Sequence, residues 1–163
     1  MDLSKAQEKF IHDWGILSTN WGVKCAMGKI HALLLVSKSG MCADEIMGKL
    51  MMSRGNVNMN LKALENWKVI KKAYMPGERK DFYVAEKDLS KVFKLIIAER
   101  KRKELDPLLA LLDEINAVQP RCPESSEFCR VTKDLGRFAQ KAEHALNALS
   151  SSQAEWISKI LIR

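Results

Sequence analysis

The stretch Met51–Asp81, MMSRGNVNMNLKALENWKVIKKAYMPGERKD, decides the fold of this chain. Its first half has the period of an amphipathic helix and begins at Ser53, a good N-cap residue. The side of this helix that would face a core carries Val57, Leu61 and Leu64. Its second half holds two apolar runs joined by Pro-Gly, which is typical of a β-hairpin. The stretch therefore predicts a helix followed by two strands and a turn.

Basic residues are concentrated in the same stretch. Between Gly48 and Lys80 there are eight lysines and arginines against two glutamates, a net +6 out of the formal +7 of the whole chain. A positive charge spread evenly over a protein serves mainly solubility, whereas a charge clustered on one helix and one hairpin favours an acidic partner. A polar helix beside a basic hairpin points to double-stranded DNA as that partner.

Helices are expected before this stretch. Apolar residues at helical spacing predict an amphipathic helix over residues 4–20, which Gly22 ends, and a mostly buried helix from about Ala26 to Leu35. Gly40 suits a left-handed position after that second helix, and Cys42 falls in the turn that follows.

A third helix is expected over residues 43–50, where Asp44 and Glu45 in the first turn suit the helix dipole. Helix, turn, helix and hairpin in this order form the winged helix–turn–helix pattern.

Long helices are expected after the hairpin. Asp88 can cap the first of them. Asp106-Pro107 predicts a kink in this helix or the start of a new one, because Asp suits a helix cap and Pro suits the first turn of a helix. A polar loop at residues 119–126 and two more helices follow, the last one carrying Trp156. The predicted fold is mainly α with a small β-hairpin wing.

The sequence from Met52 to Asp88 resembles the DNA-binding core of the GbsR-type branch of the MarR-like transcriptional regulators. Its recognition helix is matched by Ser53–Val57 and Met59–Lys62, while Asn58 replaces a frequent Ser. The wing motif of the family is matched by Pro76–Asp81, with Tyr83 two residues on. The motifs cover about Gly40 to Asp88, and the layout of helices extends the resemblance from the first helix to Lys103.

The resemblance implies a homodimer in which terminal helices form the interface. We therefore expect an N-terminal dimerisation or effector segment (residues 1–22), a winged helix–turn–helix DNA-binding domain (23–87) and a C-terminal helical dimerisation region (88–163). The recognition helix would span residues 53–67 and the wing residues 69–86. The best-known members of the branch control choline and glycine-betaine metabolism, which makes a choline-like effector one candidate among unknown ones.

Short amide and basic side chains suit a recognition helix, because Asn pairs with adenine and Arg with guanine by two hydrogen bonds each. A helix N-terminus and basic residues at a hairpin tip suit phosphates or the minor groove. Alternatively, each of these residues taken singly fits an ordinary solvated surface. The expected DNA contacts are Ser53, Arg54, Asn56, Asn58, Met59, Lys62, Arg79 and Lys80.

Other features allow two interpretations each. Trp14 and Trp21 could cage a quaternary ammonium by cation–π attraction, or could be part of a core or dimer interface. The basic run at residues 99–103 fits a salt-bridged, solvated helix segment better than a phosphate site. Cys122 and Cys129 could form a redox switch, although reduced thiols are more common in the cytoplasm.

No nucleophile–base constellation, glycine-rich phosphate loop or metal-ligand spacing is visible, so we expect no enzyme, no metal and no cofactor. The N-terminal sequence has no signal-peptide pattern and the chain no long apolar run, which favours a cytoplasmic protein that does not enter a membrane. The sequence thus predicts a homodimeric, sequence-specific repressor that binds a pseudo-palindromic operator and responds to a ligand. The alternative is a winged-helix module that binds an acidic protein.

Overall fold

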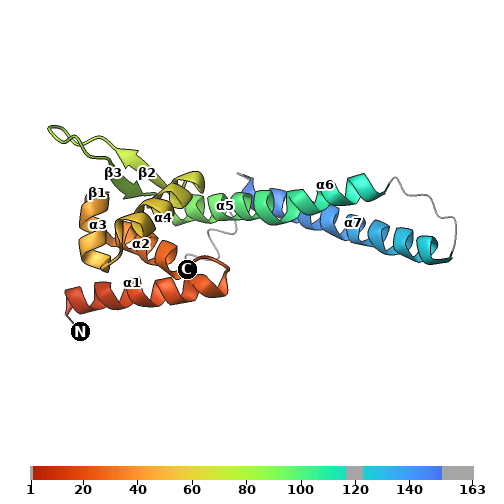
Figure 1. Cartoon of the computed structure of the whole chain (residues 1–163), viewed down its shortest axis with the longest axis horizontal. Helices are drawn as coiled ribbons and strands as arrows, with labels where there is room; N and C mark the ends of the chain where they lie inside the picture. The colour runs from red at the N-terminus through yellow and green to blue at the C-terminus, as the bar shows by residue number, and fades with distance from the viewer. Residues whose placement is uncertain (1, 117–122, 152–163) are drawn as a thin grey trace. The chain divides into compact units, whose positions relative to one another are not determined.

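The structure is a computed structural model that describes residues 2–116 and 123–151. The chain divides into two compact units, residues 1–92 and 93–163. The described residues of the first form four helices, the start of a fifth and a small antiparallel sheet, and the described residues of the second are mainly helical (Figure 1). The predicted fold class, mainly α with a small β-hairpin wing, is confirmed.

The first unit begins with two helices that pack closely together, α1 (Leu3–Asn20) and α2 (Cys25–Val36). Small residues line their contact: a Cβ atom added to Gly28 would lie only 2.2 Å from Ser18 Oγ, and 3.2 Å from the Cα atom of Gly15. Gly22, with a φ of 73°, lies in the turn between the helices, which confirms the predicted break.

The end of α2 differs from the sequence prediction. Gly40 has no left-handed backbone, since the positive-φ glycines of the described residues are Gly22 and Gly77. Instead, a Cβ atom at Gly40 would lie 3.2 Å from Val84 Cγ1, so the small residue makes room for a strand. The last carbonyl groups of α2 accept hydrogen bonds from Lys87 Nζ, at 3.1 Å for Leu34 and 2.8 Å for Ser37 just beyond the helix, with Leu35 also bonded.

Two helices follow, α3 (Ala43–Leu50) and α4 (Arg54–Asn66), with the bounds that the sequence predicts to within a residue or two. They are joined by a turn in which Met51 has a left-handed backbone, at a φ of 52°. The apolar side of α4 is buried as expected: Val57, Leu61 and Leu64 are at most 3% exposed. It packs on α2 and α3, which supply Ile30, Leu34 and Ile46 to the same core.

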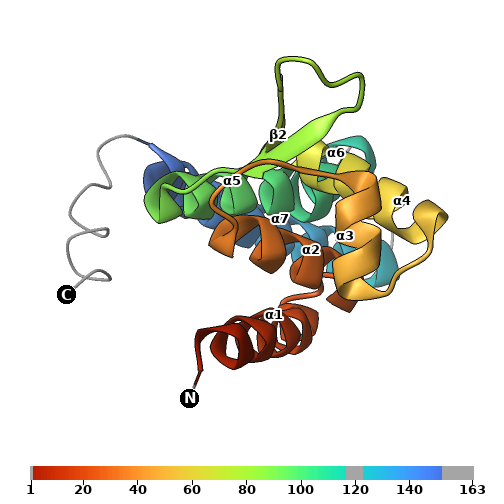
Figure 2. The same ribbon diagram turned by 90° about the vertical axis from the view of Figure 1, so that its left-hand side faces the viewer.

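The sheet of the first unit has three strands, one more than the sequence predicts. The hairpin strands β2 (Ile70–Ala73) and β3 (Phe82–Ala85) are antiparallel, and β1 (Met41–Cys42) adds to the other edge of β3. The prediction of a turn at Cys42 is wrong, because Cys42 is a buried strand residue that pairs with Phe82. The wing projects on the side of α2 opposite to α1 (Figures 1 and 2).

The helix that follows the wing, α5 (Leu89–Arg100), begins as predicted with Asp88, whose Oδ1 accepts from the backbone of Ser90 at 2.9 Å. A short π-helical segment, η1 (Lys101–Leu105), interrupts the helix before α6 (Asp106–Ile115), which confirms the predicted restart. The predicted cap role of Asp106 is wrong, because Leu105 holds that position and Asp106 accepts from Lys101 Nζ at 2.7 Å instead.

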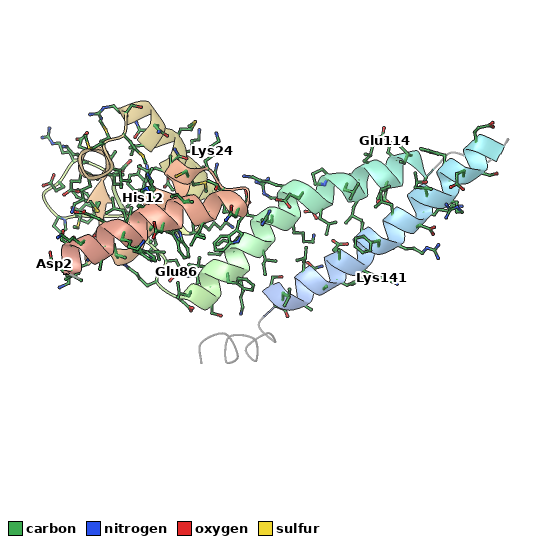
Figure 3. All side chains as sticks on the ribbon, turned by 90° about the horizontal axis from the view of Figure 1, so that it is seen from below. Asp2, His12, Lys24, Glu86, Glu114 and Lys141 are labelled. Carbon is green, nitrogen blue, oxygen red and sulfur yellow. The ribbon has the colours of Figure 1, made fainter. Side chains whose placement is uncertain are left out.

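The last described helix, α7 (Pro123–Ser150), lies alongside α6 (Figure 3). It begins earlier than the sequence predicts, since residues 123–126 are helical and not part of a loop. The rest of the predicted loop and the last predicted helix, with Trp156, lie outside the described residues.

Two sides of α7 differ in the size of their residues. The side against α6 and η1 is made of small buried residues, Cys129, Thr132 and Ala139. Large apolar side chains spaced three and four residues apart remain exposed on another side. They are Phe128, Val131, Leu135 and Phe138, from 40% to 70% exposed. We call these four residues the α7 stripe.

Candidate nucleic-acid interface

The N-terminus of α4 forms as the sequence predicts. Ser53 is the N-cap, and its hydroxyl oxygen accepts a hydrogen bond from the backbone of Asn56 at 3.3 Å. On the side of α4 away from the core, the side chains of Asn58, Met59 and Lys62 are exposed and make no hydrogen bond or ion pair within the described part of the chain. Three adaptable side chains are therefore available to a ligand.

Asn56 is held by a neighbour that the sequence interpretation did not select. Asn60, which is only 2% exposed, donates from Nδ2 to Asn56 Oδ1 at 2.6 Å and to the backbone oxygen of Asn56 at 2.8 Å. Because the amide oxygen of Asn56 already accepts one hydrogen bond, its amide group is oriented before any ligand arrives. An amide four residues earlier on the same helix is a signal that could have identified Asn60 from the sequence.

Asp44 of α3 joins two of the predicted DNA contacts. Arg54 Nη2 donates to Asp44 Oδ1 at 2.7 Å, and Lys80 Nζ donates to Asp44 Oδ2 at 2.8 Å. The hydrogen bond and charge of Lys80, together with the charge of Arg54, hold the pKa of Asp44 below its ordinary value. The same bond raises the pKa of Lys80. A single carboxylate therefore connects α3, the first turn of α4 and the wing.

The tip of the wing is a tight turn with basic residues beside it. Gly77 has a φ of 84°, and the backbone of Glu78 donates to Met75 O at 3.1 Å, so the predicted Pro-Gly turn is present. Arg79 is exposed and has no ion-pair partner within residues 2–116 and 123–151.

The strands of the wing carry two neighbouring lysines, which point to opposite sides of a strand. Lys72 donates to Asp81 Oδ2 at 2.6 Å, whereas Lys71 makes no such contact within the described residues. Both remain exposed.

The eight residues expected to contact DNA all lie in the first unit, on the N-terminal part and outer side of α4 and at the tip of the wing. We call them the recognition surface. The structure brings Arg54 and Lys80 together at Asp44, but the contacts of Arg54 with bases and of Lys80 with phosphates or the minor groove stay predictions. Asp44 is the member of the arrangement that the sequence did not reveal, because it is 10 and 36 residues from its partners.

The basic run at residues 99–103 is salt-bridged, as the sequence favours. Glu99 is 6% exposed, and its Oε1 lies 2.7 Å from Arg102 Nη2 and 3.1 Å from Lys103 Nζ. The hydrogen bond from Arg102 is the main reason that the pKa of Glu99 is lowered. Lys101 lies between Asp106 and Glu143 of α7. These charges are therefore paired within the second unit.

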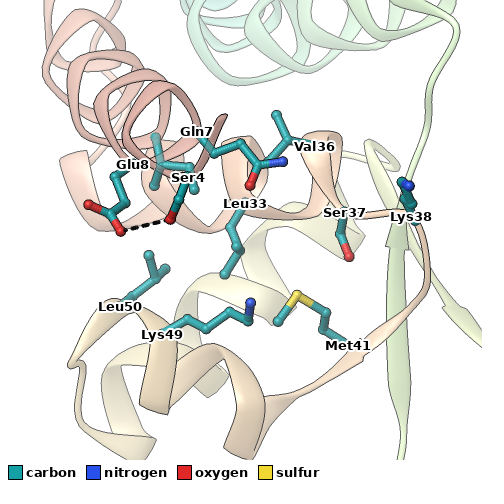
Figure 4. A pocket seen from close by; sticks show the side chains of 11 residues that line it. Ser4, Gln7, Glu8, Leu33, Val36, Ser37, Lys38, Met41, Lys49 and Leu50 are labelled. Atoms are coloured by element: carbon teal, nitrogen blue, oxygen red, sulfur yellow. Dashed lines mark hydrogen bonds between the residues drawn. The ribbon is translucent and has the colours of Figure 1, made fainter. Parts of the chain in front are cut away.

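Trp14 and Trp21 contact each other edge to face, with ring centroids 6.0 Å apart, and Phe10 lies 5.5 Å from Trp14. Their role in binding an effector stays a prediction. A hollow of about 370 Å³ lies elsewhere in the first unit, between α1, the end of α2 and α3 (Figure 4). Both polar and apolar side chains line it, among them Glu8, Leu33 and Lys49.

Among residues 2–116 and 123–151, no group of three or more His, Cys, Asp and Glu side chains is arranged to hold a metal ion. In the same part of the chain, no helix is long and apolar enough to cross a membrane.

Known proteins support the resemblance that the motifs predict. Over 97 residues, 60% of the chain, the sequence is 27% identical to the HTH-type transcriptional repressor GbsR of Bacillus subtilis (strain 168). The match spans about half of that protein, 53% of its length. A crystal structure of a protein described as a transcriptional regulator shares the fold, with a TM-score of 0.63 at 19% identity over 89% of this chain and 98% of that one. No family model matches the sequence.

Proposed function

We propose that this protein is a homodimeric, sequence-specific DNA-binding transcriptional regulator that acts as a ligand-responsive repressor. The observation that carries the proposal is the recognition surface: an amide-rich, basic side of α4 is exposed beside a basic wing in one compact unit. In helix–turn–helix proteins such a helix enters the major groove, where its first residues contact base edges. The likeness to a transcriptional repressor supports the same function.

Within the recognition surface, different residues would do different work. Asn56, Asn58 and Lys62 would contact base edges, and Met59 would touch a thymine methyl group. Arg79 at the wing tip would contact a phosphate or the minor groove, since it is exposed and unpaired among the described residues. Contacts with base edges give sequence preference, whereas the contact of Arg79 mainly gives affinity.

A second copy of the chain is the partner that best explains the α7 stripe. Its residues are spaced three and four apart, as in helices that associate side by side, and a face of exposed Phe, Val and Leu is costly to leave in water. Dimerisation would present two recognition helices to successive major grooves of a pseudo-palindrome, about one helical turn apart. Residues 1–22 and 88–163 would supply the interface.

A ligand would act by changing the separation of the two recognition helices, because it has to bind one arrangement of the dimer better than the other. Trp14 and Trp21 are the candidates for its contact, and a choline-like cation is the candidate ligand. Such a dimer is proposed to work in the cytoplasm, without a cofactor and without an enzymatic reaction.

The test is the binding of the full-length chain to genomic DNA fragments, followed by footprinting. We expect one or a few sites with two related half-sites, and an affinity that falls steeply with salt. Arg79→Ala should weaken binding to all duplexes and lower the slope of log affinity against log salt by about 0.9 for each phosphate that it no longer neutralises. Asn58→Ala should instead lower the preference for the operator.

Lys71→Ala is the matched control, since Lys71 is an exposed lysine of the same wing, outside the recognition surface and unpaired among the described residues. Equal affinity for every duplex, or binding that salt does not weaken, would show that the proposed function is wrong. Stable capture of an acidic protein by the same surface, with no binding to duplex DNA, would favour a protein-interaction module.

A further inference from the structure

Asp44 is an acidic residue in the middle of a basic surface. Both of its oxygens are engaged, Oδ1 by Arg54 at 2.7 Å and Oδ2 by Lys80 at 2.8 Å. These two cations come from different elements, the first turn of α4 and the wing. Neither the core of the unit nor the proposed contacts with bases require a carboxylate at this place.

The pairs of Asp44 are open to water and to a competing ligand. The side chains of Arg54 and Lys80 are 66% and 59% exposed, and that of Asp44 is 40% exposed. Exposed ion pairs add little to stability. Because these side chains are not buried, another anion can replace the carboxylate of Asp44. An ion pair that contributes little to folding is free to have a role in binding.

A DNA phosphate is chemically suited to replace this carboxylate. Carboxylates and phosphates both present charged oxygens side by side, and both accept charge-assisted hydrogen bonds from guanidinium and ammonium groups. The donors of Arg54 and Lys80 that now meet at Asp44 could therefore meet at one phosphate. While they are bound to Asp44, however, their positive charge is partly neutralised.

We propose that Asp44 is an intramolecular stand-in for a DNA phosphate, which occupies Arg54 and Lys80 in the free protein and weakens binding to non-specific polyanions. The inference rests on the proposed function and adds to it a residue that sets the overall affinity for polyanions. Every duplex offers phosphates, but a non-specific duplex offers little else to compensate for the broken pairs. Breaking the pairs costs the same on every duplex, so Asp44 lowers the affinity for all duplexes, and only the operator offsets this cost, through its base contacts to α4.

The wing contains a matched control for this role. Asp81 makes the same kind of exposed ion pair with Lys72, at 2.6 Å, but Lys72 is not part of the recognition surface. Asp44→Asn and Asp81→Asn each remove one negative charge from the same unit. Any difference between the two variants therefore reports the place of the charge and its partners, and not the net charge.

The first experiment measures polyanion binding of the full-length chain. The wild type, Asp44→Asn, Asp44→Ala and Asp81→Asn are eluted from heparin by salt and titrated with a random-sequence duplex that is long enough to cover both half-sites. Both Asp44 variants should elute at higher salt than Asp81→Asn and should bind the random duplex about 5- to 10-fold more tightly than the wild type. Their slope of log affinity against log salt should be steeper by up to about 0.9, the value for one additional neutralised phosphate.

The second experiment needs no nucleic acid. An amine-reactive reagent is applied to the free protein, and its attachment to Lys80 and to Lys71 is measured by mass spectrometry. Asp44→Asn should raise the labelling of Lys80 several-fold, because the amine of Lys80 is no longer held by a carboxylate. The labelling of Lys71 should not change. Circular dichroism confirms that the variants are folded.

The outcomes separate this inference from the proposed function. If Asp44→Asn and Asp81→Asn behave alike on heparin and on the random duplex, Asp44 acts only through net charge and the inference is overturned. If the wild type prefers no duplex, the proposed function is wrong, yet a persistent difference between the variants on heparin still supports the role of Asp44. Unchanged labelling of Lys80 in Asp44→Asn would also overturn it.

Discussion

At the scale of single residues, His31 is the least satisfied polar side chain of the described structure. It lies on α2, is 6% exposed, and its Nε2 has no hydrogen-bond partner among the described residues. Burial lowers its pKa from 6.5 to about 4, because the charged imidazolium would lose its hydration. The folded protein therefore keeps this histidine neutral at neutral pH.

Acid should weaken the fold through His31. Above about pH 6.5 the imidazole is neutral in both the folded and the unfolded chain, so the stability is fully present. As the pH falls towards 4, the unfolded chain binds a proton that the folded chain does not, and up to about 3 kcal/mol of unfolding free energy is lost.

His31→Leu should remove this part of the pH dependence, and His12→Leu, the same change at an exposed histidine, should keep it. The free energies of unfolding of both variants are measured by urea unfolding at several pH values between neutral and about 4.5, a range that spans most of the pKa shift of His31. An equally steep fall in His31→Leu would contradict the role of His31.

At the scale of secondary-structure elements, α4 and α2 end in different ways, the first through local contacts and the second through a residue far along the chain. The end of α4 is local: Lys68, with a left-handed backbone at a φ of 60°, donates to Glu65 O, and Val69 donates to Leu64 O. The end of α2 depends on Lys87, which is 50 to 53 residues away and whose ammonium group is bound by the carbonyl groups of Leu34, Leu35 and Ser37.

Lys87→Met should therefore destabilise the first unit. Methionine keeps most of the apolar stem but has no ammonium group, so three carbonyl groups at the end of α2 lose a charged donor. The expected loss is about 1 kcal/mol, since hydrogen bonds to charged groups are worth more than neutral ones but this site is partly open to water. Urea unfolding followed by circular dichroism measures it.

Lys91→Met is the control, because Lys91 is an exposed lysine that pairs with a single carboxylate, that of Glu86. It should unfold at nearly the same urea concentration as the wild type. If Lys87→Met also unfolded at the urea concentration of the wild type, the hydrogen bonds of Lys87 to the end of α2 would contribute nothing to stability.

At the scale of the whole molecule, the main question is what covers the α7 stripe. Phe138 is its most exposed member, at 70%. Phe138→Glu should convert the proposed dimer to a monomer, because a carboxylate cannot be buried in an apolar interface without a partner. Light scattering at micromolar concentration measures the molar mass.

The monomer that results should also bind operator DNA at least about tenfold more weakly, since the two half-sites are no longer linked. Gln140→Glu introduces the same charge on an exposed position of α7 two residues away and should leave the dimer intact. A Phe138→Glu protein that kept the mass of a dimer would exclude the α7 stripe from the interface.

Much of this fold can be predicted because its signals are local. The bounds of α3 and α4, the Ser53 cap, the Pro-Gly turn and the restart of the helix at Asp106 depend on residues within a few positions of each other. Errors occur where longer-range packing decides: Gly40 is small because Val84 lies against it, and Cys42 is in a strand because β3 pairs with it.

By itself, the sequence determined a winged helix–turn–helix unit with a basic recognition helix and wing, because periodicity, capping and turn chemistry act over short distances. Only the tertiary structure decided how the charges of that unit are connected. In the sequence, Asp44 is a residue that suits a helix dipole; in the packed unit of α3, α4 and the wing, it is the partner of both Arg54 and Lys80. Such contacts depend on distances in space, which the order of residues along the chain does not contain.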